Sequence, residues 1–317
     1  MREEEMRMQA LQLSLQLLGS GTSNLNNLIN TSNKLLAYAN GVDLTEGNDS
    51  FTKEHVDVMS ECYHDPVRFL KELKIQHPVK GSMFLEPYEF QKNMVREINS
   101  NKHNLVLAAR QMGKTNIIAA YILWYAIFHN DKTICIATGR QVNCLEIFER
   151  LRFMFDNLPF FLKPKLVSSN KTSLSFDNGS KIMSCTISPN SPRGMSINML
   201  WIDEAAYISH KYLYDFWSVA QIHFHNSTSK LIISSSANTK SGLFYDLWEK
   251  DIQSMFDSFE PSTDVSIVET ANKLIFNKIL IPYNLHPERD HNWAGHHLNV
   301  FGKDQFEKEF ECKFKDS

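Results

Sequence analysis

The sequence lacks the features that mark membrane, secreted and disulfide-stapled proteins. No apolar run approaches the ~18 residues that a membrane-spanning helix needs. The N-terminus carries Arg2 and an acidic run at positions 3–5, which does not resemble a secretory signal. There are only five cysteines, an odd number, and no two have C-x-x-C spacing. We therefore expect free thiols, a reducing cytoplasmic compartment and no membrane partner.

The sequence also lacks an excess of charge of either sign. Lysine and arginine number 33 against 36 acidic residues, which gives a net charge of −3. Composition alone therefore gives no sign of nucleic-acid binding, so a DNA-binding surface must be local or lie on another domain or subunit. The 317 residues are 43% hydrophobic and 22% charged. These values suit one large globular α/β domain, or a domain with a small subdomain.

The first 50 residues differ in composition from the rest. A helical pattern at Met6–Leu18 is followed by a stretch at Gly19–Asn33 that is rich in Ser, Asn, Gly and Thr. We interpret residues 1–50 as a mobile N-terminal segment, helical only when docked. Alternatively, its leucines pack on the domain or on a partner. Residues 51–317 are expected to form the folded domain.

From residue 104 onward, short apolar strands alternate with helical patterns. The pair Asn178-Gly179 separates two short strand-like runs, 174–176 and 181–184, and is a strong hairpin signal. Alternation of this kind indicates a mostly parallel sheet with helices on both faces. The other predicted strands are Asn104–Ala109, Lys132–Thr138, Met199–Ile202 and Leu231–Ser235, and the predicted helices are Asp65–Leu73, Thr115–Phe128 and Arg140–Asn157.

A phosphate-binding loop follows the first of these strands. Residues Ala108–Thr115 fit the pattern [AG]-x-x-x-x-G-K-[ST], between a strand and a helix as the motif requires. In such a loop, backbone N–H groups face the phosphates, the lysine contacts the β- and γ-oxygens, and the threonine ligates Mg²⁺. We therefore predict that the chain binds ATP and Mg²⁺. The predicted nucleotide contacts are Ala109, Arg110, Gln111, Met112, Gly113, Lys114 and Thr115.

Two acids end the apolar run at Met199–Ile202, which is the Walker B pattern. Asp203 is expected to hold Mg²⁺ with Thr115, and Glu204 to polarise the attacking water. In a parallel sheet both acids would emerge at the carboxyl edge, beside the phosphate loop. Such a pair is also common as a helix N-cap and first-turn charge. With the loop, however, it predicts a RecA-like (ASCE) P-loop NTPase in which Lys114 and Glu204 are catalytic.

Two further segments carry polar side chains suited to this chemistry. Gln91 lies before the loop, and its amide can donate to and accept from the adenine edge at once. Ser234, Ser235 and Ser236 end an apolar strand, where hydroxyls can sense the γ-phosphate. Alternatively, Gln91 is an ordinary glutamine on the surface of a helix, and the three serines belong to an ordinary serine-rich loop.

Two arginines can supply charge to the γ-phosphoryl group in the transition state. Arg110 lies inside the phosphate loop, and Arg193 precedes Glu204 by eleven residues in a Ser-Pro-Arg-Gly segment. Either can act within the chain or across a subunit boundary. The alternative for each is an ordinary salt bridge.

With these motifs in order, the sequence resembles the large terminase subunit of tailed bacteriophages, the DNA-packaging motor. The resemblance covers roughly residues 64–315, and its Arg-Gln-x-Gly-Lys-Thr loop is the most specific part. The segments that carry it are Phe84–Gln91, Ala109–Thr115, Ser191–Gly194, Leu200–Ala205, Ile232–Asn238 and Phe244–Trp248, and a tail with Pro287, Trp293 and Phe306–Phe310 that resembles the end of the family's ATPase region.

The resemblance implies an ATPase that drives double-stranded DNA into a procapsid in the host cytoplasm. Such ATPases assemble as a ring, commonly of five subunits, on the portal, and work with a small terminase subunit. Gln91 would contact adenine, and Ser234–Ser236 would couple hydrolysis to movement. Arg110 would act in cis and Arg193 across subunits.

Two departures from the family pattern affect these expectations. The triplet is all serine where threonine is often found, although the hydroxyl chemistry survives. Family members usually carry a C-terminal nuclease, whereas this chain ends at Ser317. We therefore expect the ATPase portion alone, without nuclease activity.

Two other functions fit part of this pattern. A helicase or translocase of another superfamily would share Gln91, the loop and the acids, but it should carry a second RecA-like domain, for which no room remains. An ATP-binding switch without motor activity would not need Glu204.

Overall fold

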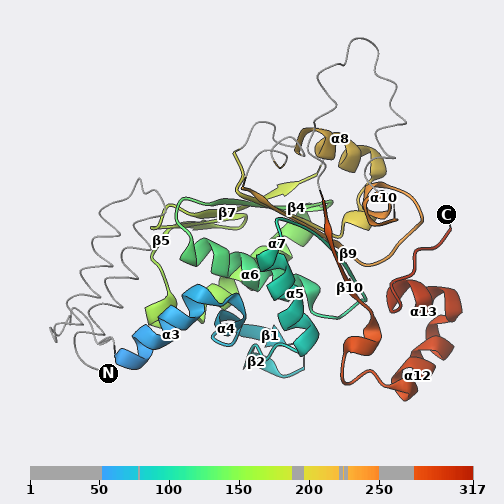
Figure 1. Cartoon of the computed structure of the whole chain (residues 1–317), viewed down its shortest axis with the longest axis horizontal. Helices are drawn as coiled ribbons and strands as arrows, with labels where there is room; N and C mark the ends of the chain where they lie inside the picture. The colour runs from blue at the N-terminus through green and yellow to red at the C-terminus, as the bar shows by residue number, and fades with distance from the viewer. Residues whose placement is uncertain are drawn as a thin grey trace, which may run out of the picture. The chain divides into compact units, whose positions relative to one another are not determined.

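The computed structural model describes residues 52–77, 79–187, 196–220, 224, 228–249 and 275–316. The chain divides into two compact units (Figure 1). Among the described residues, the first comprises those up to Glu86 with Ala120–Lys132 and Glu149–Ile182, and the second comprises Pro87–Ala119, Thr133–Phe148 and those from Met183 onward. The predicted N-terminal segment 1–50, with its helix, lies outside the described residues.

The second unit is built on parallel strands in the order β10-β3-β9-β8-β4. The central residues of β3, β4, β8 and β9 are apolar and buried, as expected for strands covered on both faces. The four strands predicted here are confirmed to within a residue or two, whereas β10 was not predicted. The bounds are β3 His103–Ala108, β4 Thr133–Thr138, β8 Met199–Asp203, β9 Lys230–Ser235 and β10 Asn277–Ile281.

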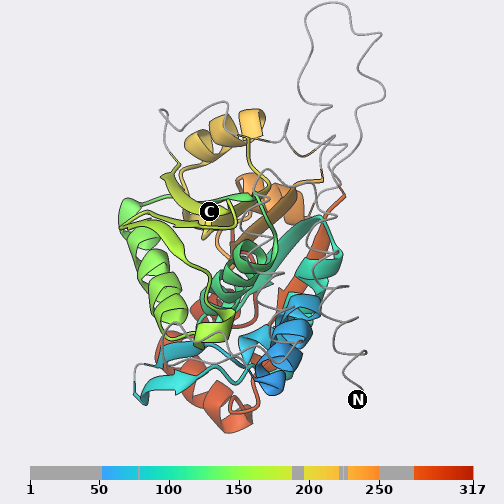
Figure 2. The ribbon, with the colours of Figure 1, turned by 90° about the vertical axis from the view of Figure 1, so that its left-hand side faces the viewer.

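Helices cover both faces of these strands. In Figure 1, α5 and α10 lie on opposite sides of β9 and β10, and α8 and α10 lie side by side in both views (Figure 2). No helix in the described part of the chain is long and apolar enough to cross a membrane. The bounds are α5 Glu89–Ser100, η2 Ala205–Tyr207, α8 His210–Ala220, α10 Leu243–Glu249, η3 Tyr283–Leu285, α12 His291–Phe301 and α13 Lys303–Glu309.

The first unit combines helices with short antiparallel strands. Helices α6 and α7 begin in the second unit and end in the first, close to their predicted bounds. Trp124 of α6 donates to the carbonyl oxygen of Cys62 at 2.7 Å, inside the apolar core of this unit. The bounds are α3 Lys53–His64, α4 Pro66–Leu70, β1 Lys74–His77, β2 Gly81–Phe84, α6 Lys114–Phe128, α7 Gln141–Asp156, η1 Phe160–Leu162, β5 Leu166–Asn170, β6 Ser173–Phe176 and β7 Lys181–Thr186.

The predicted helix Asp65–Leu73 is wrong at its C-terminal end. Helix α4 stops at Leu70, after which the chain forms tighter i→i+3 turns through Leu73. The carbonyl of Leu73 then accepts from the N–H of Leu85, which follows the β1–β2 hairpin. This long-range hydrogen bond, invisible in local periodicity, ends the helix.

The predicted hairpin at Asn178-Gly179 is confirmed, since β6 and β7 are neighbours in the sheet. Its turn also serves a second purpose. The Asn178 amide donates to the carbonyls of Ala126 and Ile127 at 2.9 and 3.0 Å, near the end of α6. The turn therefore satisfies carbonyl groups that a helix end would otherwise leave unpaired.

Candidate nucleotide-binding site

The predicted phosphate loop joins the end of β3 to the start of α6, as the motif requires. Gln111 and Gly113 both have positive φ, 60° and 75°, so the loop turns tightly before the helix. A β-carbon on Gly113 would lie 2.5 Å from the Nε2 atom of Gln91. Only glycine therefore fits this position, and the N-terminus of α6 faces the space where phosphates bind in such loops.

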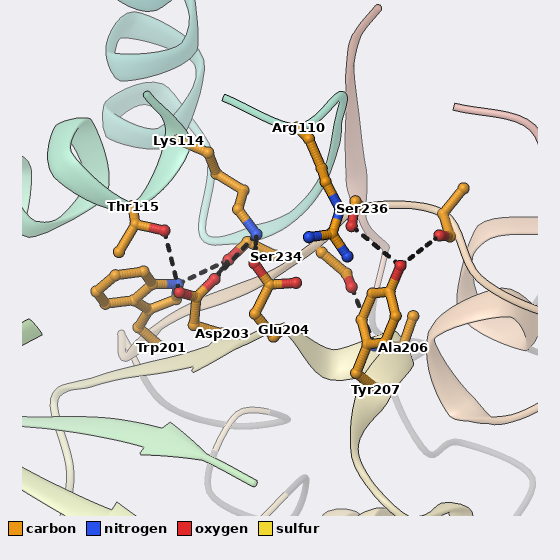
Figure 3. A network of polar contacts seen from close by, with 12 residues as sticks. Arg110, Lys114, Thr115, Trp201, Asp203, Glu204, Ala206, Tyr207, Ser234 and Ser236 are labelled. Atoms are coloured by element: carbon orange, nitrogen blue, oxygen red, sulfur yellow. Dashed lines mark hydrogen bonds and ion pairs between the residues drawn. The ribbon is translucent and has the colours of Figure 1, made fainter. Parts of the chain in front are cut away.

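The predicted catalytic side chains converge at the end of this loop (Figure 3). The Lys114 Nζ atom lies 3.0 Å from Asp203 Oδ1 and 3.1 Å from Glu204 Oε1. The Thr115 hydroxyl donates to Asp203 Oδ2 at 3.2 Å. Residues about 90 positions apart are thus brought together at the carboxyl edge of the sheet, because β3 and β8 both flank β9 in parallel.

The lysine and the two acids differ in exposure. The side chains of Lys114 and Asp203 are 8% and 5% exposed, whereas Glu204 is 38% exposed. Burial alone would lower the pKa of Lys114, but the charges of Asp203 and Glu204 outweigh it and raise that pKa. The lysine is therefore held as a cation.

The backbone of Glu204 is in the left-handed region, with φ 54° and ψ 40°. Non-glycine residues in this region are uncommon and tend to occur at functional sites. The turn carries the glutamate side chain away from the buried end of β8, so it is positioned to contact water.

The oxygen atoms of Thr115 and Asp203 suit a magnesium ion. Mg²⁺ is a hard cation that commonly takes one or two protein oxygens and completes its shell with water and substrate phosphates. A hydroxyl and a carboxylate 3.2 Å apart, beside a phosphate loop, match that donor set. Within the described residues, no group of three or more His, Cys, Asp or Glu side chains forms an alternative metal site.

The serine triplet binds protein groups at the end of β8. Ser234 donates to Asp203 Oδ1 at 2.7 Å and accepts from the Trp201 indole at 2.9 Å, so it orients the carboxylate. Ser235 accepts from the Ala206 N–H at 3.1 Å. Ser236 donates to the Tyr207 hydroxyl at 3.4 Å. The triplet is therefore linked to the segment that carries both acids.

The side chain of Gln91 is hydrogen-bonded to the phosphate loop. Its Nε2 donates to the Met112 carbonyl at 3.0 Å, and its Oε1 accepts from the Tyr88 N–H at 3.0 Å. The side chain is buried, at 7% exposure. The Nε2 and Oε1 atoms of Gln91 can each form one more hydrogen bond. Recognition of adenine by Gln91 stays a prediction.

Comparison with known proteins gives the family. A family model described as "Terminase large subunit, T4likevirus-type, N-terminal" matches residues 105–316, about two thirds of the chain. This chain belongs to the terminase large subunit family. The matched range includes the phosphate loop, both acids and the serine triplet, whereas Gln91 precedes it.

Solved structures show that the fold is that of terminase ATPase domains. The ATPase domain of Thermus phage P74-26 large terminase is 16% identical, with a TM-score of 0.55 over 72% of this chain and 94% of that one. The HK97 bacteriophage large terminase is 16% identical, with a TM-score of 0.54 over 80% and 55%. A large terminase from another thermophilic bacteriophage, in complex with ADP, is 10% identical, with a TM-score of 0.51 over 72% and 54%. The terminase chain thus spans about half the length of the last two proteins.

Two residues of the C-terminal segment of the terminase chain contact the phosphate loop, and the sequence patterns assigned a role to neither. The Nε atom of Arg110 donates to the carboxylate of Glu309, at the end of α13. Arg289, which precedes α12, donates to the carbonyls of Arg110 and Gln111 at 3.0 and 3.1 Å. Glu309 lies in the run Phe306–Phe310, which resembles the end of the family's ATPase region, but its contact with Arg110 and that of Arg289 are visible only in the folded chain.

The other predicted arginine of this terminase, Arg193, lies outside the described residues. Its role therefore stays a prediction.

Proposed function

We propose that this chain hydrolyses ATP, with Mg²⁺, to power the translocation of double-stranded viral DNA into a procapsid. The observation that supports this most directly is the meeting of Lys114, Thr115, Asp203 and Glu204 at the end of the phosphate loop. Membership of the terminase large subunit family supports the motor role.

Each residue has a distinct task in the hydrolysis step. Lys114 binds the β- and γ-phosphate oxygens, which replace the carboxylates as its anionic partners. Thr115 and Asp203 would hold Mg²⁺, which neutralises phosphate charge when bound. Glu204 is released from Lys114 as the phosphate takes that cation, and its carboxylate then orients the attacking water.

The remaining predicted residues complete the site. Gln91 recognises adenine from its place beside Met112. Arg110 and Arg193 supply positive charge to the γ-phosphoryl group, in cis and across a subunit boundary respectively. The serine triplet, bonded to Asp203 and to the η2 turn, passes the loss of the γ-phosphate to the segments around it.

The partners follow from the family role. The DNA is double-stranded, the chain docks on the portal of a procapsid in the host cytoplasm, and a small terminase subunit assists it. Several copies, commonly five, form the ring. A neighbouring copy would then supply Arg193 to each site, so the isolated chain is expected to be less active than the assembled ring.

The decisive experiment compares ATP hydrolysis by the wild type and Glu204→Gln. Removing the water-orienting acid should lower kcat by about 10²-fold or more. Glu149→Gln is the matched control, because it removes one exposed carboxylate on α7. If the wild type and Glu204→Gln hydrolyse ATP at equal rates and both still bind ATP, the chain would be an ATP-binding switch without motor activity. Translocation of DNA into procapsids by the assembled protein tests the motor role separately.

A further inference from the structure

Arg110 is held from two directions by one residue of the C-terminal segment. Its Nε donates to a carboxylate oxygen of Glu309, and its backbone N–H donates to the Glu309 carbonyl at 2.9 Å. The two residues are 199 positions apart in the chain. Because both the side chain and the backbone of Arg110 are bound, Glu309 fixes the position and the direction of this arginine.

The pair is asymmetric in burial. The Glu309 side chain is 8% exposed, whereas that of Arg110 is 56% exposed. Glu309 is also held on its other oxygen, Oε1, which accepts from the Gln305 amide at 2.8 Å. A fixed, buried carboxylate therefore anchors an exposed guanidinium, which is the arrangement expected when the carboxylate orients the arginine.

The atom that Glu309 binds determines what the arginine can still do. A guanidinium presents one N–H at Nε and two at each Nη, in a rigid planar fork. Nε is bound by Glu309, and the guanidinium also hydrogen-bonds to the Tyr207 hydroxyl. The Nη groups can form the bidentate contacts that arginine makes with phosphate. In Figure 3 the Arg110 side chain extends from the loop into the region between Glu204 and Tyr207.

A second C-terminal residue restrains the same part of the loop. Arg289 donates to the carbonyls of Arg110 and Gln111, and its guanidinium lies 4.7 Å from the centre of the Trp293 ring. Burial would lower the pKa of Arg110, but its hydrogen bond to Glu309, the charge of Glu309 and the Tyr207 hydroxyl outweigh it and raise that pKa. Arg110 is thus a permanently charged group on a restrained backbone.

We propose that Glu309 is a positioning residue for Arg110: its carboxylate takes the Nε–H and directs the two Nη groups toward the γ-phosphate. The inference rests on the proposed ATPase function and extends it to Glu309 at the end of α13. Arg110 contacts the phosphate, and Glu309 acts only through Arg110.

A double-mutant cycle on ATP hydrolysis tests this proposal. The four proteins are the wild type, Glu309→Gln, Arg110→Ala and the double variant. We expect Glu309→Gln to lower kcat roughly 10-fold while KM for ATP changes by less than about 3-fold, since misplacing a catalytic group affects the chemical step. In the Arg110→Ala background the same substitution should have no further effect on kcat, because no Nε remains to be oriented.

Glu307→Gln is the matched control. It removes a carboxylate from the same helix, where Glu307 pairs with Lys313 and Lys315 and not with the phosphate loop. Its kcat should equal that of the wild type. Thermal unfolding of every variant shows whether a loss of kcat comes from misorientation of Arg110 or from loss of the folded state. If Glu309→Gln does not fold, Arg110→Lys replaces it, since lysine keeps the charge but has no Nε fork; we expect it to lose kcat as Arg110→Ala does.

The outcomes distinguish this inference from the function on which it rests. A Glu309→Gln variant with wild-type kcat, an equal loss in both backgrounds, or wild-type kcat for Arg110→Lys would overturn the positioning role alone. A wild type that does not hydrolyse ATP, or hydrolyses it no faster than Glu204→Gln, would overturn both.

Discussion

Gly113 occupies a backbone conformation that side chains rarely adopt, at the point where the loop meets α6. A β-carbon there would lie 2.5 Å from the Gln91 amide nitrogen, which donates to the Met112 carbonyl. Gly113→Ala should therefore lower the free energy of unfolding by about 1–2 kcal/mol and weaken ATP binding, because strain and the displaced amide both distort the loop. Urea unfolding and calorimetric titration with ATP measure the two effects.

The control for this prediction is Gly295→Ala in α12. An added β-carbon there meets no atom within 4 Å, and the helical backbone accepts alanine. It should stabilise the protein by roughly 0.5–1 kcal/mol. A Gly113→Ala variant that behaves like Gly295→Ala would show that the loop tolerates a side chain.

At the scale of elements, Lys230 ties β9 to the end of α5. Its Nζ donates to the carbonyls of Ile98, Asn99 and Asn101, at 3.2, 2.8 and 3.1 Å. These carbonyls lie at the helix C-terminus, where a cation is favoured. The N-terminal turn of the same helix carries Gln91, which hydrogen-bonds to the phosphate loop.

Lys230→Met should lower the free energy of unfolding by about 1–3 kcal/mol, because it removes the ammonium that these three carbonyls share, although the Asn101 carbonyl keeps its hydrogen bond from the Asn104 amide. Lys181→Met, at an exposed strand position, should change it by less than about 0.5 kcal/mol. Denaturant unfolding gives both values, and hydrogen exchange should show faster opening of the last turn of α5 in the first variant only. Equal stability of the two variants would contradict this role for Lys230.

At the scale of the whole molecule, the site links ligand binding to stability. A ligand that binds only the folded chain stabilises it by about 2.7 kcal/mol at 100 times its Kd. ATP with Mg²⁺ should therefore raise Tm, and EDTA should remove most of the increase. In Asp203→Asn, the shift with Mg²⁺ should fall to the value seen with EDTA. An identical shift for the wild type with and without EDTA would contradict a metal held by Thr115 and Asp203.

All five cysteines are free and buried, in agreement with the expected free thiols. Burial raises the pKa of Cys62 and Cys312 to about 12, which disfavours the reactive thiolate. The thiols therefore behave as apolar core groups in the folded chain.

Much of the fold and the centre of the site could be predicted from local patterns. Strands β3, β4, β8 and β9 are contiguous apolar runs, and the phosphate loop is one uninterrupted segment of eight residues. Asp203 is the last residue of β8 and Glu204 follows it, so parallel pairing was enough to place both acids beside Lys114. The strand β10 was missed because its residues alternate between half-buried and exposed at the sheet edge and only Ile281 is buried, unlike the residues of the interior strands.

The sequence by itself determined which chemical groups the site contains: a loop lysine, a threonine, two strand-end acids and a hydroxyl triplet. Only the tertiary structure decided which partners hold them: Ser234 for Asp203, Gln91 for Met112, and Glu309 for Arg110. The physical reason is that a motif records the residue types of one contiguous segment. A hydrogen bond between segments depends on how the chain returns, which for Arg110 happens 199 residues later.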